Sequence, residues 1–479
     1  MNGFNTTHSA RGSLFSRHGW IRACHRLDER RRRFMHVPWA GGVVLVACVA
    51  AAMLLANLPW TAELYEKLLH TDLSLLVRTP DGRIDLAFPR GMNVEKLVND
   101  GLMVIFFFVV GLEIKREMYC GELSSMRKAI LPVMAAAGGM LAPALIYLAF
   151  NHGTEAVNGW GIPTATDIAF AIGVLSLVGS RVPLSLKIFL TALAVVDDLG
   201  AILVIALFYG ETVKLGCLAI ALLIMAGLYL LNRLGETRIA FFLIPAFVVW
   251  GLFYYSGIHA TLSGVAMAMV IPMRPRYSRS YFFRQLHNYT RSLELADRGE
   301  VRFPNAEQRE CLHRMKKLSR DSIGMSYRME ELLNPYVTFL IMPIFALANA
   351  GVAIDAEYLD IFHFSPQNGS VGMGVFFGLL VGKPLGIFLA SWLSVKSGLA
   401  EMPQGATWRV LLAVACLGGI GFTMSIFVDS LAFTHPAFIN QGKIAILLGS
   451  LASAVLSMLM IHLTARDGSE NGNLQRRDV

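Results

Sequence analysis

The chain has 479 residues, of which 55% are hydrophobic and 16% are charged, with a formal net charge of +8. Soluble domains carry about 25% charged residues, so this composition excludes an ordinary water-soluble protein and indicates a chain that crosses a membrane several times. Its basic residues lie mainly in the N-terminal segment and in one long loop, where Glu and Asp are interleaved with them. We therefore expect no nucleic-acid partner. The cysteines show no paired spacing, so neither a zinc site nor a disulfide framework is predicted.

The N-terminal segment, residues 1–38, is polar and ends in the arginine run 30–33. A basic segment before a first apolar span is retained on the cytoplasmic side of the membrane. The apolar stretch 39–59 is longer than the core of about 7–15 residues of a cleavable signal peptide, so it predicts an uncleaved first span. In the polar stretch 60–93 that follows, residues 75–87 have the pattern of a β-hairpin around Thr79-Pro80-Asp81-Gly82.

The remaining chain predicts an all-α membrane protein with twelve spans. The expected spans are residues 39–59, 94–117, 129–150, 160–178, 183–209, 215–231, 239–255, 256–273, 335–352, 371–395, 410–431 and 439–463. Residues 39–273 thus hold spans one to eight, and residues 335–464 hold spans nine to twelve. Between them, residues 274–334 predict a basic cytoplasmic loop with a partly helical, membrane-lying segment. Residues 465–479 form a short polar tail.

The distribution of Lys and Arg predicts the orientation of these spans. Basic residues gather in the N-terminal segment and in the loops 115–128, 181–187, 233–238, 274–334 and 396–409. They are nearly absent from the loops 151–161, 210–213, 354–370 and 432–438. This alternation predicts that both termini are cytoplasmic. The stretch 60–93 is then extracytoplasmic, although it holds a few basic residues.

Asp197 and Asp198 are adjacent carboxylates in the middle of the predicted fifth span, within an apolar run from Pro183 to Tyr209. One ionisable side chain at that depth costs at least about 2.5–3.5 kcal/mol on insertion scales. Two in succession therefore require a partner ion, a proton or a water-filled cavity. Because consecutive helical residues point about 100° apart, we expect at least one of them to line a cavity.

The predicted fourth and eleventh spans each contain a break. Residues 160–170 place Gly, Pro and two Thr before Asp167, the pattern of a helix that stops and restarts. Glycines at 418–421 interrupt the eleventh span, and Lys383 lies in the tenth. Spans three to five and ten to twelve then correspond to each other but start on opposite sides of the membrane. That is the inverted repeat of secondary transporters, whose ion site lies where the broken helices meet.

In six motifs the sequence closely resembles the NhaA-type sodium/proton antiporters of bacterial inner membranes. These motifs are Gly111–Glu117, Thr164–Ala171, Ala194–Ala201, Gly257–Leu262, Gly382–Gly386 and Gly419–Ser425. The resemblance covers roughly residues 35–273 and 330–465. It implies a multi-pass inner-membrane transporter, not an enzyme, with crossed fourth and eleventh helices. It also implies electrogenic, pH-regulated exchange of cytoplasmic Na⁺ or Li⁺ for external H⁺, no cofactor beyond these ions, and a homodimer joined through the extracytoplasmic hairpin.

The resemblance also assigns roles at the membrane midplane. Asp197 and Asp198 match the ion-binding and proton-carrying aspartates, and Thr166 matches a hydroxyl near the cation path. Asp167 and Lys383 match residues that offset the dipole ends of the broken helices. These roles agree with the physical chemistry, because Na⁺ is a hard cation that takes oxygen ligands and each helix end carries about half a charge.

A carboxylate shielded in this way can hold either a proton or a sodium ion, so competition for one site couples the two fluxes. We further expect Lys383 to pair with one of the two aspartates when sodium is absent. Lithium is also an expected substrate, because it is a similarly small, hard cation.

The resemblance links four further residues to the pH response: Glu113, Glu117, His259 and Glu330. The sequence departs from the family pattern in its arginine-rich N-terminal segment, in the extended loop 274–329, and at Asn334, where a titratable histidine can occur. By contrast, Asp429 and Lys443 lie toward the outer ends of the last two spans. Their positions predict side chains that reach the membrane interface.

Two other functions remain open at this point. An intramembrane aspartyl protease needs its two carboxylates on different helices, whereas Asp197 and Asp198 are adjacent on one. A sodium-coupled symporter of an organic anion uses a similar scaffold with broken helices. The arrangement of lysine and aspartates, and the lack of an evident substrate pocket, favour simple ion exchange.

Overall fold

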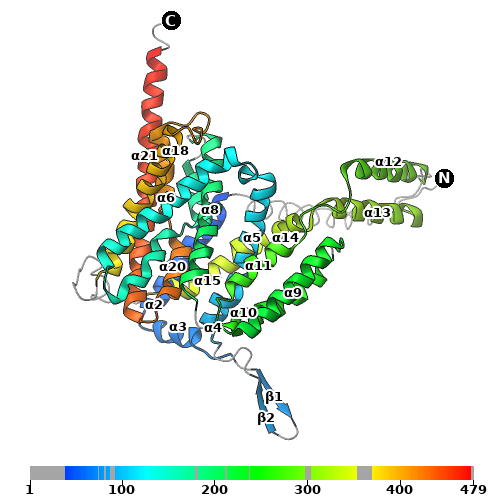
Figure 1. Ribbon diagram of the computed structural model, residues 1–479, viewed down its shortest axis with the longest axis horizontal. Helices are drawn as coiled ribbons and strands as arrows, with labels where there is room; N and C mark the ends of the chain where they lie inside the picture. Colours follow the sequence, from blue (N-terminus) through cyan, green and yellow to red (C-terminus); the bar gives the residue numbers. More distant parts are fainter. Residues whose placement is uncertain are drawn as a thin grey trace, which may run out of the picture.

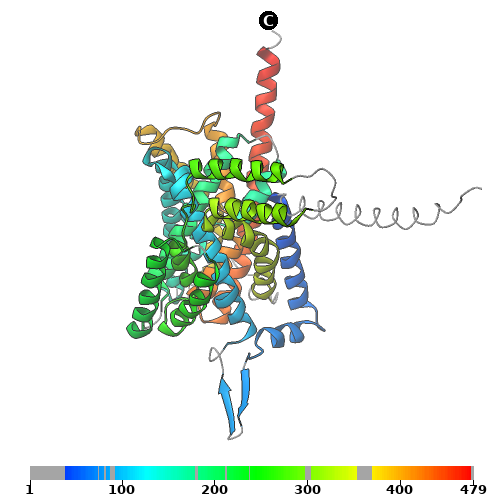
Figure 2. The same ribbon diagram turned by 90° about the vertical axis from the view of Figure 1, so that its right-hand side faces the viewer.

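The computed structural model describes residues 38–73, 75–79, 82–86, 92–178, 182–210, 213–236, 238–296, 304–352 and 369–475. The expectations for the basic segment 1–37 and for the loop residues 353–368 lie outside these residues. The described chain is a bundle of helices, most of which run roughly side by side (Figure 1). The β-hairpin lies beyond one end of this bundle, here called the hairpin end, and α21 extends beyond the other (Figure 2).

The helices of the N-terminal part follow one another along the chain from α2 to α11. They are α2 (Pro38–Asn57), α3 (Ala62–Leu69), α4 (Val94–Lys96), η1 (Leu97–Leu102), α5 (Met103–Cys120), η2 (Glu122–Ser124), α6 (Met126–Asn151), η3 (Glu155–Thr164), α7 (Ile168–Val178), α8 (Leu184–Phe208), α9 (Leu215–Arg233), α10 (Ala240–Ser256) and α11 (Thr261–Val270). The C-terminal part continues with α12 (Arg279–Leu295), α13 (Ala306–Ser322), α14 (Met325–Tyr336), η5 (Val337–Ile341), α15 (Met342–Asn349), α17 (Val371–Phe377), η6 (Gly378–Gly382), α18 (Lys383–Lys396), α19 (Trp408–Gly418), α20 (Phe422–Ala432) and α21 (Pro436–Gln475).

Among the described residues, eight continuous helices are long and apolar enough to cross a membrane. Two further pairs, η3 with α7 and α19 with α20, pass the same test when each pair is taken as one bent span. The apolar helices α10 and α11 are shorter, with 17 and 10 residues. The chain is therefore a polytopic helical membrane protein.

The ninth apolar segment begins earlier than the sequence predicts. Its helix starts at Met325 and continues through Pro335 into η5 and α15. Proline removes one helical hydrogen bond and crowds the preceding turn, and here the wider π-helical turn η5 directly follows it. The polar residues ahead of Pro335, which made this stretch look like a loop, occupy the first turns of the same helix.

The remainder of the loop 274–334 contains the two helices α12 and α13, which pack against each other. The side chains of Ser278 and Asn305 cap their first turns by accepting backbone hydrogen bonds. Figure 2 shows both helices lying across the direction of the bundle rather than along it. The segment is thus more fully helical than the partly helical loop that the sequence predicts.

The β-hairpin consists of strands β1 (Leu75–Thr79) and β2 (Gly82–Leu86). They pair antiparallel, with Leu75 opposite Leu86 and Thr79 opposite Gly82. Residues 80 and 81, which the sequence pattern places in the turn, lie outside the described residues.

Helices α6 and α18 pack with their backbones unusually close together. A Cβ atom on Gly138 would collide with the carbonyl oxygen of Gly386, and a Cβ on Gly386 would collide with that of Gly138. Small residues allow this approach in membrane helices. The contact brings α18, and with it Lys383, against the helices that hold the acidic residues.

Candidate functional site

Two broken helical pairs meet inside the bundle. The axes of η3 and α7 differ by 43°, and those of α19 and α20 differ by 46°. Residues at the two breaks contact each other directly. The amide of Asp167 donates to the carbonyl of Ile420 at 2.7 Å, and the Thr166 hydroxyl donates to the carbonyl of Gly418 at 3.0 Å. Each break thereby satisfies backbone groups that the other leaves without helical partners.

The Asp167 carboxylate caps two helices at once and is fully buried. One oxygen accepts the amide of Phe170 in the first turn of α7, at 3.0 Å. The other accepts the amide of Thr423 in the first turn of α20, at 3.2 Å, and also the Thr423 hydroxyl. A negative charge at a helix N-terminus is favourable. The Asp167 carboxylate stabilises two N-termini at once, those of the opposed half-helices α7 and α20.

Lys383 lies at the complementary position. Its ammonium donates to Asp197 Oδ2 at 2.6 Å and to the carbonyl of Thr164, the last residue of η3. Both side chains of the ion pair are buried. The ammonium therefore sits at the C-terminal end of one half-helix while it neutralises one of the two adjacent aspartates. The helix that carries it widens into the π-helical turn η6 immediately before Lys383, and Pro384 follows.

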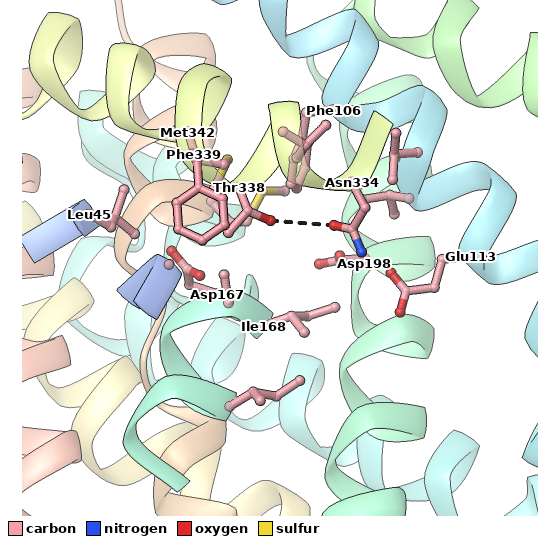
Figure 3. A pocket seen from close by; sticks show the side chains of 17 residues that line it. Leu45, Phe106, Glu113, Asp167, Ile168, Asp198, Asn334, Thr338, Phe339 and Met342 are labelled. Carbon is pink, nitrogen blue, oxygen red and sulfur yellow. Dashed lines mark hydrogen bonds between the residues drawn. The ribbon is translucent and has the colours of Figure 1, made fainter. Parts of the chain in front are cut away.

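Asp198 has different surroundings from Asp197. It lines a cavity of about 280 Å³ together with Asp167 and Glu113. Figure 3 shows Asp167 on one side of the cavity and Asp198 and Glu113 on the other, with the hydrogen-bonded pair Asn334 and Thr338 between and above them. Asp197 Oδ1 and Asp198 Oδ1 have no hydrogen-bond partner among the described residues. One aspartate is thus held by a lysine, while its neighbour presents a free oxygen beside open space.

Glu113, Glu117 and Glu330, three of the four residues that the resemblance assigns to a pH response, meet at this cavity's edge. Arg116 forms ion pairs with Glu330 of α14, with Glu113 at 3.4 Å and with Glu117 at 3.4 Å. Glu113 also lines the cavity, so the cluster is continuous with the space beside Asp198. His259 does not join it, because its ring contacts the carbonyl of Tyr209 after the end of α8.

The cavity lies in the half of the bundle away from the hairpin. Its lining includes Gly41 and Leu45, which belong to the first half of α2, and α2 leads toward the hairpin end (Figure 1).

Thr166 is beside the break but does not line this cavity; its hydroxyl is bound to the backbone of α19.

Sequence reasoning missed Thr423 as a partner of Asp167. Its position just after the glycine-rich break in the eleventh span marks Thr423 as a candidate helix-capping residue. The sequence does not show that it binds Asp167, because that contact joins two segments distant in the chain.

The prediction for Asp429 and Lys443 was wrong. Neither side chain reaches the interface, since Asp429 is 0% exposed and Lys443 is 8% exposed.

Comparison with known proteins agrees with this architecture. Residues 32–461 match the family model described as Na⁺/H⁺ antiporter 1. The chain is 44% identical over 437 residues to the Na(+)/H(+) antiporter NhaA 2 of Sorangium cellulosum, covering 91% of this chain and 90% of that one. It is 43% identical over 437 residues to the Na(+)/H(+) antiporter NhaA of Bacteroides thetaiotaomicron, covering 90% and 97% of the two chains. It is 41% identical over 428 residues to the Na(+)/H(+) antiporter NhaA of Salmonella arizonae, covering 89% and 96%. The chain therefore belongs to the Na⁺/H⁺ antiporter 1 family.

Proposed function

We propose that this protein is a secondary active transporter that exchanges cytoplasmic Na⁺ for external H⁺ across a bacterial inner membrane, and that it also carries Li⁺. The names of its relatives support the exchange. The observation that carries the proposal is the unequal environment of two neighbouring buried acids. Asp197 is bound by Lys383, whereas Asp198 offers an unpaired oxygen to a cavity.

This inequality gives the site two ways to satisfy its negative charge. A hard monovalent cation takes carboxylate and carbonyl oxygens as ligands, and the free oxygens of Asp197 and Asp198 are such ligands. When no metal ion is bound, protons on Asp197 and Asp198, together with the Lys383 ammonium, neutralise the negative charge of the two carboxylates. Binding of Na⁺ therefore requires release of protons or withdrawal of Lys383, and this competition couples the two flows.

The same competition makes the exchange electrogenic. Two acids and one ammonium compete with a single monovalent cation, so more than one proton can leave for each Na⁺ that binds. Asp167 takes no part in this exchange, because its oxygens are occupied by donors from two helices. Its role is to hold the crossing in place, and the Thr166 hydroxyl supports the same break close to the cation path.

We assign the protein twelve spans, counting the eight long helices, the two bent pairs, α10 and α11. The inverted repeat relates α6, η3–α7 and α8 to α17–α18, α19–α20 and α21. The reciprocal contact of Gly138 with Gly386 supports it, because the first helix of one half packs on the first helix of the other. The basic loops orient both termini to the cytoplasm. The hairpin then lies outside, where it joins a homodimer.

pH regulation is assigned to the ion-pair cluster around Arg116 at the edge of the cavity. Glu113, Glu117 and Glu330 compete there for one guanidinium. A change in protonation redistributes these ion pairs between α5 and α14, both of which line the cavity. His259 lies elsewhere, at the carbonyl of Tyr209, and acts separately if it responds to pH.

The test is Na⁺-dependent proton movement in everted membrane vesicles with a fluorescent pH probe. Addition of Na⁺ alone should collapse a pre-formed proton gradient with the wild-type protein, and Asp198→Asn should abolish the response. Asp321→Asn is the matched control, since Asp321 is also a buried acid but lies on α13 and pairs with Arg320; it should retain exchange. A wild-type protein that leaves the gradient intact unless an organic anion is added would be a symporter, and the proposal would be wrong.

A further inference from the structure

Asp429 on α20 is a buried acid that the exchange mechanism above does not use. Its side chain is fully buried, and neither of its carboxylate oxygens has a hydrogen-bond partner among the described residues. A buried carboxylate without hydrogen bonds is costly, and a fold retains such a group mainly where it is used. Asp429 therefore requires an explanation that is separate from Asp197 and Asp198.

The fold makes room for this carboxylate. A Cβ atom on Gly442 of α21 would collide with Oδ1 of Asp429 and would lie 3.1 Å from Oδ2. Both oxygens therefore lie against the backbone of α21 at a position where only glycine leaves the space. The next residue, Lys443, is also buried, and its charge acts on Asp429. The pair forms no ion-pair contact within 4.0 Å among the described side chains.

The other titratable groups near Asp429 are already engaged. The charge of Asp429 acts on two tyrosines, Tyr147 of α6 and Tyr209 at the end of α8. Tyr147 donates its hydroxyl to the carbonyl of Ala156, and Tyr209 donates to that of Asn158, both at 2.7 Å. Both carbonyls belong to the first turns of η3, so the two tyrosine hydroxyls bind η3 and not the Asp429 carboxylate. Glu95 of α4 is the further charge that acts on Lys443.

Asp429 lies on the opposite side of the crossing from the cavity. Thr423, which binds Asp167, is the second residue of α20, and Asp429 follows six residues later, or about 9 Å farther along the helix. Met424 is the last residue of α20 that lines the cavity. Beyond it, the Ser425 hydroxyl donates to the carbonyl of Ile162 at 2.8 Å and joins α20 to η3. A path from Asp198 to the hairpin end between η3 and α20 would pass Asp429, a fully buried carboxylate on that side.

We propose that Asp429 forms a second binding site for the transported monovalent cation, on the hairpin side of the crossing, with Lys443 as its resident countercharge. This inference rests on the proposed exchange of Na⁺ for H⁺. The two free carboxylate oxygens are ligands that a hard cation prefers. Lys443 supplies a buried ammonium whose charge acts on Asp429, but it does not contact the carboxylate as Lys383 contacts Asp197, so both oxygens remain available to a cation. The site receives the cation when the side of the bundle facing the hairpin opens, before the cation leaves to the exterior.

The experiment compares the apparent KM for Na⁺ at the two faces of the membrane, with everted and right-side-out vesicles of the same variant. Asp429→Asn keeps the shape of the side chain and removes its charge. It should raise the KM at the external face by about tenfold, the effect of losing one charged ligand, and leave the cytoplasmic-face KM within about twofold. Ser430→Ala is the matched control on the next residue of α20 and should change neither value.

A second variant separates a cation site from a structural ion pair. Lys443→Met removes the competing ammonium and should lower the external KM, and it provides the test if Asp429→Asn does not reach the membrane. The double variant should keep the high external KM of Asp429→Asn. Restoration of the wild-type KM in the double variant, or an unchanged external KM in both single variants, would overturn the inference. Failure of the wild-type protein to move protons with Na⁺ would instead refute the proposed function.

Discussion

Removal of the Lys383 ammonium tests how the charges at the crossing depend on each other. Lys383→Met leaves Asp197 buried without its partner and leaves the Thr164 carbonyl without its donor. Breaking a buried ion pair by removing one member costs about 3–5 kcal/mol, because the remaining charge is uncompensated. We expect a loss of folding free energy in this range at neutral pH.

The double variant Lys383→Met/Asp197→Asn removes both charges. It should recover most of the lost stability, because neither group is then uncompensated, although exchange remains abolished. The stability of each purified variant is measured by thermal unfolding in detergent, and the coupling follows from the double-mutant cycle. Lys115→Met is the matched control: Lys115 is also buried, but it donates only to backbone carbonyls, at 2.7 and 2.6 Å for those of Met269 and Ile271.

Lys115→Met combined with Asp197→Asn should show additive effects, because the two groups share no partner. If Lys383→Met/Asp197→Asn were also additive, the ion pair would contribute nothing to the native state. That result, or full exchange activity in Lys383→Met, would refute the argument that this lysine balances both the aspartate and the helix end.

Three further predictions concern other parts of the molecule. Thr423→Val removes a hydroxyl that donates to the Asp167 carboxylate. The free energy of unfolding should fall by about 1.5–3 kcal/mol, measured by thermal unfolding in detergent. An unchanged melting temperature would contradict the role of Asp167 as a cap of both α7 and α20. Arg116→Gln removes the centre of the ion-pair cluster and should move the activity–pH curve in vesicles, whereas a superimposable curve would exclude the cluster from pH regulation. Burial raises the pKa of Tyr65 on α3 from 10.0 to about 12, so its stabilising contribution is complete below pH 10 and is lost as the pH rises toward 12. Tyr65→Phe should abolish that alkaline loss and cost about 0.5–1.5 kcal/mol at neutral pH, because its hydroxyl donates to the carbonyl of Leu347 at 2.6 Å; an unchanged alkaline unfolding profile would argue against it.

Much of the architecture follows from local sequence signals. Long apolar runs predict the membrane helices, and the glycine and proline residues before Asp167 and around 418–421 predict where two helices break. Charges inside apolar runs single out Asp197, Asp198 and Lys383 because burial makes them expensive. Each of these signals needs only neighbouring residues, which is why it can be read without a structure.

The rest depends on contacts between distant segments. Which aspartate Lys383 binds, and that Thr423 completes the shell of Asp167, follow from how two helices cross. The sequence places Asp429 and Lys443 near the ends of their spans, where side chains usually reach water, and only the packing of α20 on Gly442 shows that they are enclosed. Pro335 misled the prediction for the ninth helix, because a widened turn accommodates it.

The double cap at Asp167 has a mechanical consequence. One carboxylate is bonded to the first turn of α7 and to the first turn of α20, so neither can shift alone without breaking a charged bond. The short helices α7 and α20 are therefore expected to move together as one rigid body. Opening toward either solution would then come from tilting between this body and the surrounding helices, while the Asp167 carboxylate keeps its place relative to both short helices.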